Sequence, residues 1–432
     1  MKICSKKDIK VITGIMAASM LLGGCTKTAE EKKPQIKADV KVKTEIELNK
    51  VADTDYDQKV MDEQYRRYCF DLLKQTVTDN GSNGNIMISP ASIMMALDMV
   101  AAGAKGDSLK QLTDLFAVGQ GPLTQQAYAS ALMKKINDSE DVEFNCANAV
   151  WANKTRIGDK VNLDYIEYIR KTFSAEYTVT VFDKNTPKEI NSWIDKQTDH
   201  MIKKAVDNLE DDTVMVLVNA IAFDGKWAEP YEEHQVRDGE FRKHDGGKQT
   251  VKFLNGTENK YFETDKAKGF MKGYKGGKYA FLTILPKDEN ISANDFAKDF
   301  TSADYEKFIK SVSGDYIVRT SMPEFKSEFE MGMNDTLKRL GCKDIFGQDS
   351  DLSGIAGEKG DLYVSKVIHK SYIEVNAAGT KASAVTVVTL DVAGAMPVEQ
   401  EIREVICDRP FVYAIVDTET MAPVFVGTVN QI

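Results

Sequence analysis

The residue types that carry out acid–base, nucleophilic and metal chemistry are present in this 432-residue chain, but their spacing does not match the patterns of enzymes. The four histidines form no HxxxH or HExxH motif, so the sequence does not predict a metal site. No GxSxG motif indicates a nucleophile elbow. Acidic side chains are numerous, and a solvated surface accounts for them without an acid–base pair.

The glycine-rich segment 272–279, KGYKGGKY, differs from a phosphate-binding loop at two required positions. Such a loop needs Gly where this chain has Lys272, and Ser or Thr where it has Tyr279. The glycines instead predict a hairpin turn before a strand over 279–286. We therefore expect no enzyme and no cofactor.

The cysteines form no CxxC pair, and their neighbours are mostly apolar or helical. Buried free thiols are favoured over a disulfide framework. The six are Cys4, Cys25, Cys69, Cys146, Cys342 and Cys407.

Helix and strand patterns predict an α+β fold in one domain. Helical spacing and caps favour helices over 56–81 and 89–103, and later segments read mainly as strands. The run 214–223, VMVLVNAIAF, is typical of a strand covered on both faces, yet it contains Asn219, whose buried amide needs partners. No linker-like break or internal repeat follows residue 60.

The N-terminus resembles a bacterial lipoprotein signal. A basic segment, Lys2 to Lys10, precedes an apolar stretch from Val11 to Leu22 that is too short for an ordinary membrane span. It ends in Leu-Gly-Gly-Cys, so residues 1–24 are predicted as a signal peptide and Cys25 as the site of lipid attachment. An ordinary secretory signal with a chance cysteine is the alternative.

The next segment, residues 25–58, is rich in Lys, Glu, Asp and Thr and predicts a flexible tether, with the folded domain at 59–432. We expect an extracytoplasmic lipoprotein at the cell membrane or cell surface. The formal net charge is −10, and residues 1–24 contribute +3, so the remaining chain is more acidic still. This charge argues against nucleic acid as a partner.

Six segments resemble the serpin family of serine protease inhibitors, in the family's order and over nearly all of residues 60–432. They are NIMISPASIMMALDMVAAGAKGDSLKQL, NAVWANKT, LVNAIAFDGKWAEPYEE, SMPEFKSEFEMGMNDTLKRLGCKDIF, VIHKSYIEVNAAGTKASAVT and DRPFVYAIVDTETMAPVFVGTV. The resemblance implies three β-sheets, eight or nine helices and an exposed reactive-centre loop near the C-terminus. It also implies a monomer that forms a covalent acyl complex with its target protease.

The resemblance also assigns roles to unusual polar residues. It implies a buried hydrogen-bonded cluster, the shutter, beneath the opening point of the large sheet, and it places Trp227 at the breach, where the loop first inserts. The shutter residues are Ser89, Ser92, Asn219 and His369. A satisfied polar group in the core is the alternative reading of each.

The loop sequence suits insertion into a sheet as a new strand. Its hinge residues are Gly379, Thr380, Ala382 and Ala384. One face of the run 380–390 is uncharged and starts with small side chains, whereas the other holds Lys381, which we expect to stay in solvent. The strand is expected to lie outside the fold until a protease cuts beyond it. Alanines stand at 377 and 378, where the family usually has acidic residues.

Counting forward from the hinge predicts cleavage between Ala393 and Gly394, and counting back from the DRPF segment favours Ala395 or Met396. All four residues are small or apolar, and segment 382–402 has no Lys or Arg. An elastase-like or subtilisin-like protease is therefore expected rather than a trypsin-like one. The alternatives are a non-inhibitory serpin that acts as a surface binding protein, and an inhibitor of cysteine proteases.

Overall fold

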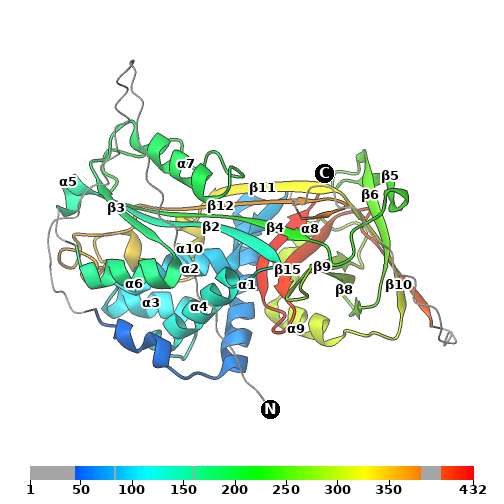
Figure 1. The fold of residues 1–432 in the computed structure, drawn as a ribbon, viewed down its shortest axis with the longest axis horizontal. Coiled ribbons are helices and arrows are strands. Elements are labelled where there is room, and N and C mark those ends of the chain that lie inside the picture. The colour runs from blue at the N-terminus through cyan, green and yellow to red at the C-terminus, as the bar shows by residue number, and fades with distance from the viewer. Residues whose placement is uncertain (1–43, 82–83, 159–160, 381–399) are drawn as a thin grey trace, which may run out of the picture. The chain divides into compact units, whose positions relative to one another are not determined.

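The structure is a computed structural model that describes residues 44–81, 84–158, 161–380 and 400–432. Three sheets organise this part of the chain, here named A, B and C (Figure 1). Sheet A contains, in spatial order, β11 (Phe325–Gly332), β12 (Lys366–Val375), β13 (Gly379–Thr380), β4 (Met215–Lys226), β2 (Val142–Asn153) and β3 (Glu176–Thr180). Sheet B contains β1 (Ile86–Ile88), β16 (Pro423–Val429), β15 (Phe411–Asp417), β9 (Tyr279–Pro286), β8 (Ala267–Gly273) and β7 (Tyr261–Glu263). Sheet C contains β14 (Ile402–Ile406), β10 (Ile317–Pro323), β6 (Lys248–Glu258) and β5 (Val236–Arg242).

Ten α-helices are present within the described ranges, and eight of them have seven or more residues. They are α1 (Gln58–Asn80), α2 (Pro90–Ala101), α3 (Gly106–Phe116), α4 (Pro122–Asn137), α5 (Lys154–Ile157), α6 (Leu163–Phe173), α7 (Thr186–Gln197), α8 (Ala293–Asp299), α9 (Ser302–Lys310) and α10 (Asn334–Arg339). Three short 3-10 helices accompany them: η1 (Leu48–Asp53), η2 (Glu233–Gln235) and η3 (Asp344–Phe346). The predicted α+β class with three sheets is confirmed.

Sheet A is covered on both faces, as the apolar run of β4 predicts. Helix α2 lies against one face, and α7 lies across the other (Figure 1). Alternate β4 residues serve the two faces: Leu217 and Ile221 join the main core, whereas Val216 and Val218 join a second cluster with Ile190 of α7. A strand inserted into this sheet therefore needs side chains that can be buried on both faces.

The hairpin turn predicted at 272–279 joins β8 and β9, and Gly276 and Gly277 have φ of +79° and +71° there. Cys69, Cys342 and Cys407 are buried free thiols, as predicted, whereas Cys146 is a free thiol of intermediate exposure. None of the helices in the described segments is both long and apolar enough to cross a membrane.

Residues 44–58 differ from the flexible tether that their polar composition predicts. Ile46 and Val51 are 3% and 4% exposed, and η1 contacts α4. Glu45 Oε2 accepts a hydrogen bond from Gly106 N at 2.8 Å. Leu48 and Tyr56 also pack against the core, so four apolar side chains attach this polar segment and the described chain joins the core before residue 59.

Candidate functional site in sheet A

Three polar side chains form a buried row across the middle of sheet A. Asn148 of β2 lies opposite Asn219 of β4, and Asn219 lies opposite His369 of β12. Each is at most 2% exposed. Because residues directly opposite on neighbouring strands point to the same face, all three side chains face α2.

His369 links this row to α2 and to the opposite strand. Its Nδ1 lies 2.8 Å from Asn219 Oδ1, and its Nε2 accepts from Ser89 N at 3.2 Å. The Ser89 backbone N–H can only donate, so the imidazole is neutral and carries its proton on Nδ1. Burial lowers the pKa of His369 to about 3, which keeps the ring neutral at physiological pH.

The two serines connect the row to the start of α2. Ser89 caps this helix by accepting from Ser92 N, and its hydroxyl donates to Val424 O at 2.8 Å. Asn219 Nδ2 donates to the carbonyl and hydroxyl oxygens of Ser92, and also to Asn148 Oδ1 at 2.8 Å. The structure therefore brings Ser89, Ser92, Asn219 and His369 into one network.

Asn148 belongs to the network but was not among the predicted residues. It lies in the segment NAVWANKT, which resembles the family, and a polar residue within a buried strand was an available signal. The Nδ2 of Asn148 is buried with no hydrogen-bond partner in the described structure.

The network crosses the contact between β4 and β12, within the part of sheet A where these two strands pair directly. β4 and β12 are parallel and pair directly over Val216–Ala222 and Lys366–Tyr372. Above these seven pairs, the short β13 lies between the two strands and is antiparallel to both. The sheet is therefore closed around the His369–Asn219 contact and already separated at one end.

Strand β13 contradicts the expectation that the whole hinge lies outside the fold. Gly379 and Thr380 pair with Lys226 and Gly225 of β4, and Thr380 also pairs with Val375 of β12. Thr380 is fully buried, and its hydroxyl lies 2.6 Å from the Tyr274 hydroxyl. A Cβ on Gly379 would lie 2.2 Å from the carbonyl oxygen of Gly225, so glycine permits this approach.

The hinge is held by backbone hydrogen bonds where the family pattern would place acidic side chains. Trp227 N donates to Ala378 O at 3.1 Å, and Tyr231 N donates to Ala377 O at 2.9 Å. Ala377 N donates to Glu324 Oε1 at 3.2 Å, so one carboxylate does serve the hinge, but from the junction between β10 and β11. Alanine at 377 and 378 therefore does not leave the hinge unanchored.

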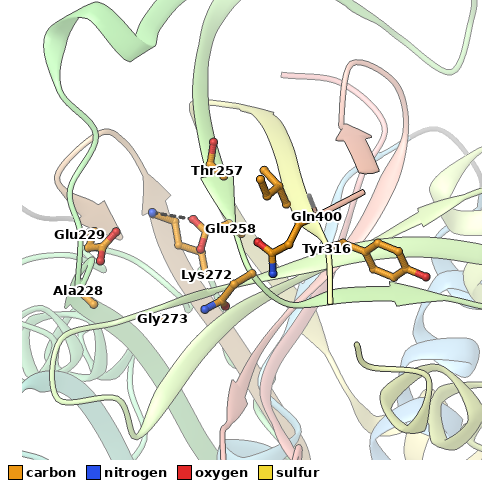
Figure 2. Close-up of a pocket in the computed structure, with 10 residues that line it drawn as sticks. Ala228, Glu229, Thr257, Glu258, Lys272, Gly273, Tyr316 and Gln400 are labelled. Atoms are coloured by element: carbon orange, nitrogen blue, oxygen red, sulfur yellow. Dashed lines mark hydrogen bonds and ion pairs between the residues drawn. The ribbon is translucent and has the colours of Figure 1, made fainter. Parts of the chain in front are cut away.

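Trp227 lies beside the hinge, at the end of β4. Its indole N–H donates to Asn376 O at 2.9 Å, and its ring stacks on Tyr274 at a centroid distance of 4.6 Å. Next to it lies a pocket of about 430 Å³, where the ammonium of Lys272 pairs with Glu258 at 2.9 Å (Figure 2). Gln400, the first described residue after the loop, also lines this pocket (Figure 2).

Several predicted site residues lie outside the described residues. They are Cys25, Ala382, Ala384, Ala393, Gly394, Ala395 and Met396. Lipid attachment, the later hinge positions and the scissile bond therefore remain predictions. Among the residues that the structure describes, no group of His, Cys, Asp or Glu side chains could hold a metal ion.

This arrangement of sheet A matches a known family in sequence and in structure. The family model described as "Serpin (serine protease inhibitor)" matches residues 63–432. Leukocyte elastase inhibitor A of Mus musculus is 31% identical over 370 residues, which cover 83% of this chain and 96% of the relative.

Solved structures of a thermophilic serpin, tengpin, show the same fold. In its native state it has a TM-score of 0.79 and 35% identity, with coverage of 88% of this chain and 96% of the other. In its latent state it has a TM-score of 0.72 and 33% identity, with coverage of 87% and 98%. Together with the family model, these similarities show that the chain belongs to the serpin family, which is a family of protease inhibitors rather than of enzymes.

Proposed function

We propose that the chain is a covalent, conformational-trapping inhibitor of serine proteases that have a small apolar specificity pocket. The observation that carries this proposal is the geometry of β13, which lies between β4 and β12 in the register that a longer inserted strand would continue. Both neighbouring strands are aligned for it, because β4 and β12 pair with each other in the same register below.

The register gives a definite destination for Thr386. If each later loop residue moves one pair further down the two strands, Thr386 lies between Asn219 and His369. Its side chain then faces α2, because Thr380 already points to that side and alternate residues share a face. A threonine hydroxyl can donate and accept, so it can replace the hydrogen bond that insertion breaks.

The opposite face is also compatible with insertion. If the same register continued, Lys381 would lie between Asp224 and Glu374, two acidic positions at the end of the gap between β4 and β12. Val387 would lie between Val218 and Ile368, which belong to the apolar cluster beneath α7. On this face of the inserted strand, only the first residue, Lys381, would remain near solvent. The charged side chain of Lys381 and the apolar side chain of Val387 therefore suit their positions.

The proposed reaction is acyl transfer that stops halfway. The serine hydroxyl of the protease attacks the carbonyl carbon of Ala393, the peptide bond to Gly394 breaks, and the new amine leaves with a proton. An ester joins Ala393 to the protease. Insertion of the freed strand would move the attached protease and distort its active site, so that water no longer hydrolyses the ester.

Small or apolar residues at 393–396 support a target with a shallow apolar pocket. The name of the mouse relative, a leukocyte elastase inhibitor, supports the same class. An acidic pocket would bury its charge without a partner, which disfavours trypsin-like enzymes. We also propose that a lipid on Cys25 anchors the inhibitor outside the cytoplasm, as the Leu-Gly-Gly-Cys sequence predicts.

The proposal is tested by incubating residues 26–432 with elastase-like, subtilisin-like and trypsin-like proteases, followed by denaturing gels. A covalent complex with either of the first two supports inhibition. Cleavage with a large rise in melting temperature supports insertion without trapping and therefore the non-inhibitory alternative. Cleavage without stabilisation refutes the insertion mechanism, and mass spectrometry of the released peptide locates the scissile bond.

Two substitutions of Thr386 distinguish the effect of burying its side chain from the effect of its hydrogen bonds. Thr386→Arg is expected to abolish the covalent complex, because a charge would have to enter the buried network. Thr386→Val keeps the shape of the side chain and is expected to form the complex, with a lower melting temperature of the cleaved form. Equal complex formation by all three proteins would contradict the predicted register.

A cell-fractionation experiment tests the anchor. The full chain is expected in the membrane fraction, and Cys25→Ser is expected to release it. Membrane association of the variant would refute lipid attachment at this residue.

A further inference from the structure

A basic cleft lies beneath β14, the strand that follows the loop, and belongs to none of the sites described so far. It has a volume of about 560 Å³ and is lined by β14, β10 and the ends of β7, β8 and β9. Five of its lining side chains are cations: Lys268, Lys287, Arg319, Arg403 and Arg409. They come from distant parts of the sequence, so no basic run in the sequence indicates the cleft.

Acidic side chains of the cleft neutralise only some of these cations. Glu263, Glu289 and Glu404 also line it. Glu263 pairs with Lys287 at 2.8 Å, and Glu404 lies 3.7 Å from Arg319. Glu289 lies 3.6 Å from Arg242, outside the lining.

Arg403 has its carboxylate partner outside the lining, where Glu401 lies 2.7 Å from its Nη1. Lys268 and Arg409 have no carboxylate at ion-pair distance within the described residues, and both donate to backbone carbonyls. The lining therefore has two more cations than anions, in a chain whose net charge is −10.

Arg409 is the strongest indication that an anion belongs here. It is only 7% exposed, and Pro286 O, at 2.8 Å, is its one hydrogen-bond acceptor in the described part of the chain. A guanidinium has five N–H donors. Burial lowers the pKa of Arg409, and the nearby charges of Glu289 and Asp408 oppose this effect without forming ion pairs.

Arg403 provides a second unused donor beside the same cleft. Its guanidinium lies over the ring of Tyr316 at 4.7 Å, which fixes its plane. Its Nε is buried and has no acceptor among the residues that the structure describes. Planar guanidinium groups with free N–H donors recognise the oxygens of sulfate and phosphate groups well.

From this geometry we infer that the cleft binds an oxyanion, a sulfate or phosphate group carried on a small molecule, through Arg403, Arg409 and Lys268. Such a ligand would join β14, through Arg403, to Lys268 of β8 and to Arg409 in the segment between β14 and β15. Among the described strands, β14 lies at the edge of sheet C and pairs with β10 alone. The Lys268 Nζ contact to Glu404 O, at 2.9 Å, is one of its few other attachments. The ligand therefore stabilises the strand to which the loop returns.

Calorimetry and melting temperatures of residues 26–432 test the site, with inorganic pyrophosphate and a sulfated disaccharide as probes at constant ionic strength. We expect saturable binding of at least one probe and a higher melting temperature. Whichever probe binds more tightly identifies the source of the oxyanion. Sodium chloride at equal ionic strength is the control for general screening.

Three variants locate the binding. Lys268→Gln and Arg403→Gln are each expected to weaken it at least tenfold. Lys252→Gln removes an exposed lysine from β6 in the same sheet, outside the cleft, and is expected to leave the affinity unchanged. No binding of either probe at millimolar concentration, or equal loss in all three variants, would overturn the inference. Because no protease is involved, this outcome is independent of the proposed inhibition.

Discussion

The buried imidazole of His369 should make the stability of the native fold depend on pH. Burial lowers its folded-state pKa from 6.5 to about 3. Above pH 6.5 both the folded and the unfolded chain contain neutral imidazole, so the contribution of this group to stability is complete. As the pH falls, the unfolded chain binds a proton that the folded chain does not bind until the pH nears 3. Stability is therefore lost progressively between about pH 6.5 and pH 3.

The size of the effect follows from the shift. Each pH unit in this window costs about 1.4 kcal/mol, so pH 5 should cost roughly 2 kcal/mol relative to pH 7.5. Protonation would also give Nε2 a hydrogen that faces the Ser89 N–H, so the folded state cannot accept the proton without breaking the network. Carboxylates titrate in the lower part of the window, and a variant is needed to isolate the histidine.

The assay compares melting temperature and urea midpoint at pH 7.5, 6.5, 5.5 and 5.0. His369→Gln is expected to destabilise the fold by about 1–3 kcal/mol at pH 7.5, because its amide cannot match both hydrogen bonds. Its loss of stability between pH 7.5 and 5.0 is expected to be smaller than that of the wild type. His234→Gln, at a side chain 70% exposed, should keep the wild-type dependence. Equal pH dependence in the wild type and His369→Gln would refute the reasoning.

Three further predictions concern other buried groups. Thr380→Arg is expected to turn the inhibitor into a substrate, because Thr380 is fully buried between two strands; a normal yield of covalent complex on gels would refute this. Burial raises the pKa of Asp98, so its stability contribution declines as the pH rises above 3.8. Asp98→Asn should therefore stabilise the fold at pH 7.5 by about 1–2 kcal/mol and raise the melting temperature. An unchanged melting temperature would contradict the idea that the buried carboxylate destabilises the fold. Burial raises the pKa of the Cys69, Cys342 and Cys407 thiols, so none should react with a thiol reagent before unfolding, and rapid labelling would show that they are accessible.

The sequence predicted the parts of the fold that depend on periodicity and on single unusual residues. The continuous apolar run of β4 indicated a strand covered on both faces, and both clusters around Val218 and Leu217 exist. Asn219 within that run indicated a buried network before any neighbour was known. Its partners could be named only through the family resemblance, because Ser92 and His369 lie 127 and 150 residues away in the sequence.

Features that depend on backbone register could not be predicted from the sequence. The position of Thr380 inside sheet A depends on where β4 and β12 separate, which no local pattern encodes. The attachment of Ile46 and Val51 was missed because a few apolar residues scattered among polar ones give no clear periodic signal. The basic cleft was missed for a related reason, since its cations come from segments that are far apart in the sequence.

Because the hinge is already partly inserted, the position at which further insertion must begin to separate β4 from β12 can be identified. Direct pairing of β4 with β12 ends at Ala222 and Tyr372. In the register of β13, Lys381 and Ala382 would occupy positions above that point and separate no existing pair, whereas Ser383 would be the first residue to do so. Further insertion must then separate the seven pairs and break the His369–Asn219 hydrogen bond.

Loosening the shutter should therefore speed spontaneous insertion more than loosening the hinge. Asn219→Ala removes the hydrogen bonds that hold β2, β4, β12 and α2 together, whereas Tyr274→Phe removes one contact to a hinge residue that is already inserted. We expect Asn219→Ala to lose inhibitory activity several-fold faster than the wild type during incubation without protease, and Tyr274→Phe to stay close to it. This expectation assumes that the kinetic barrier to insertion is the separation of the paired strands β4 and β12. If Tyr274→Phe lost activity faster than Asn219→Ala, the barrier would lie at the hinge, and this interpretation of sheet A would be wrong.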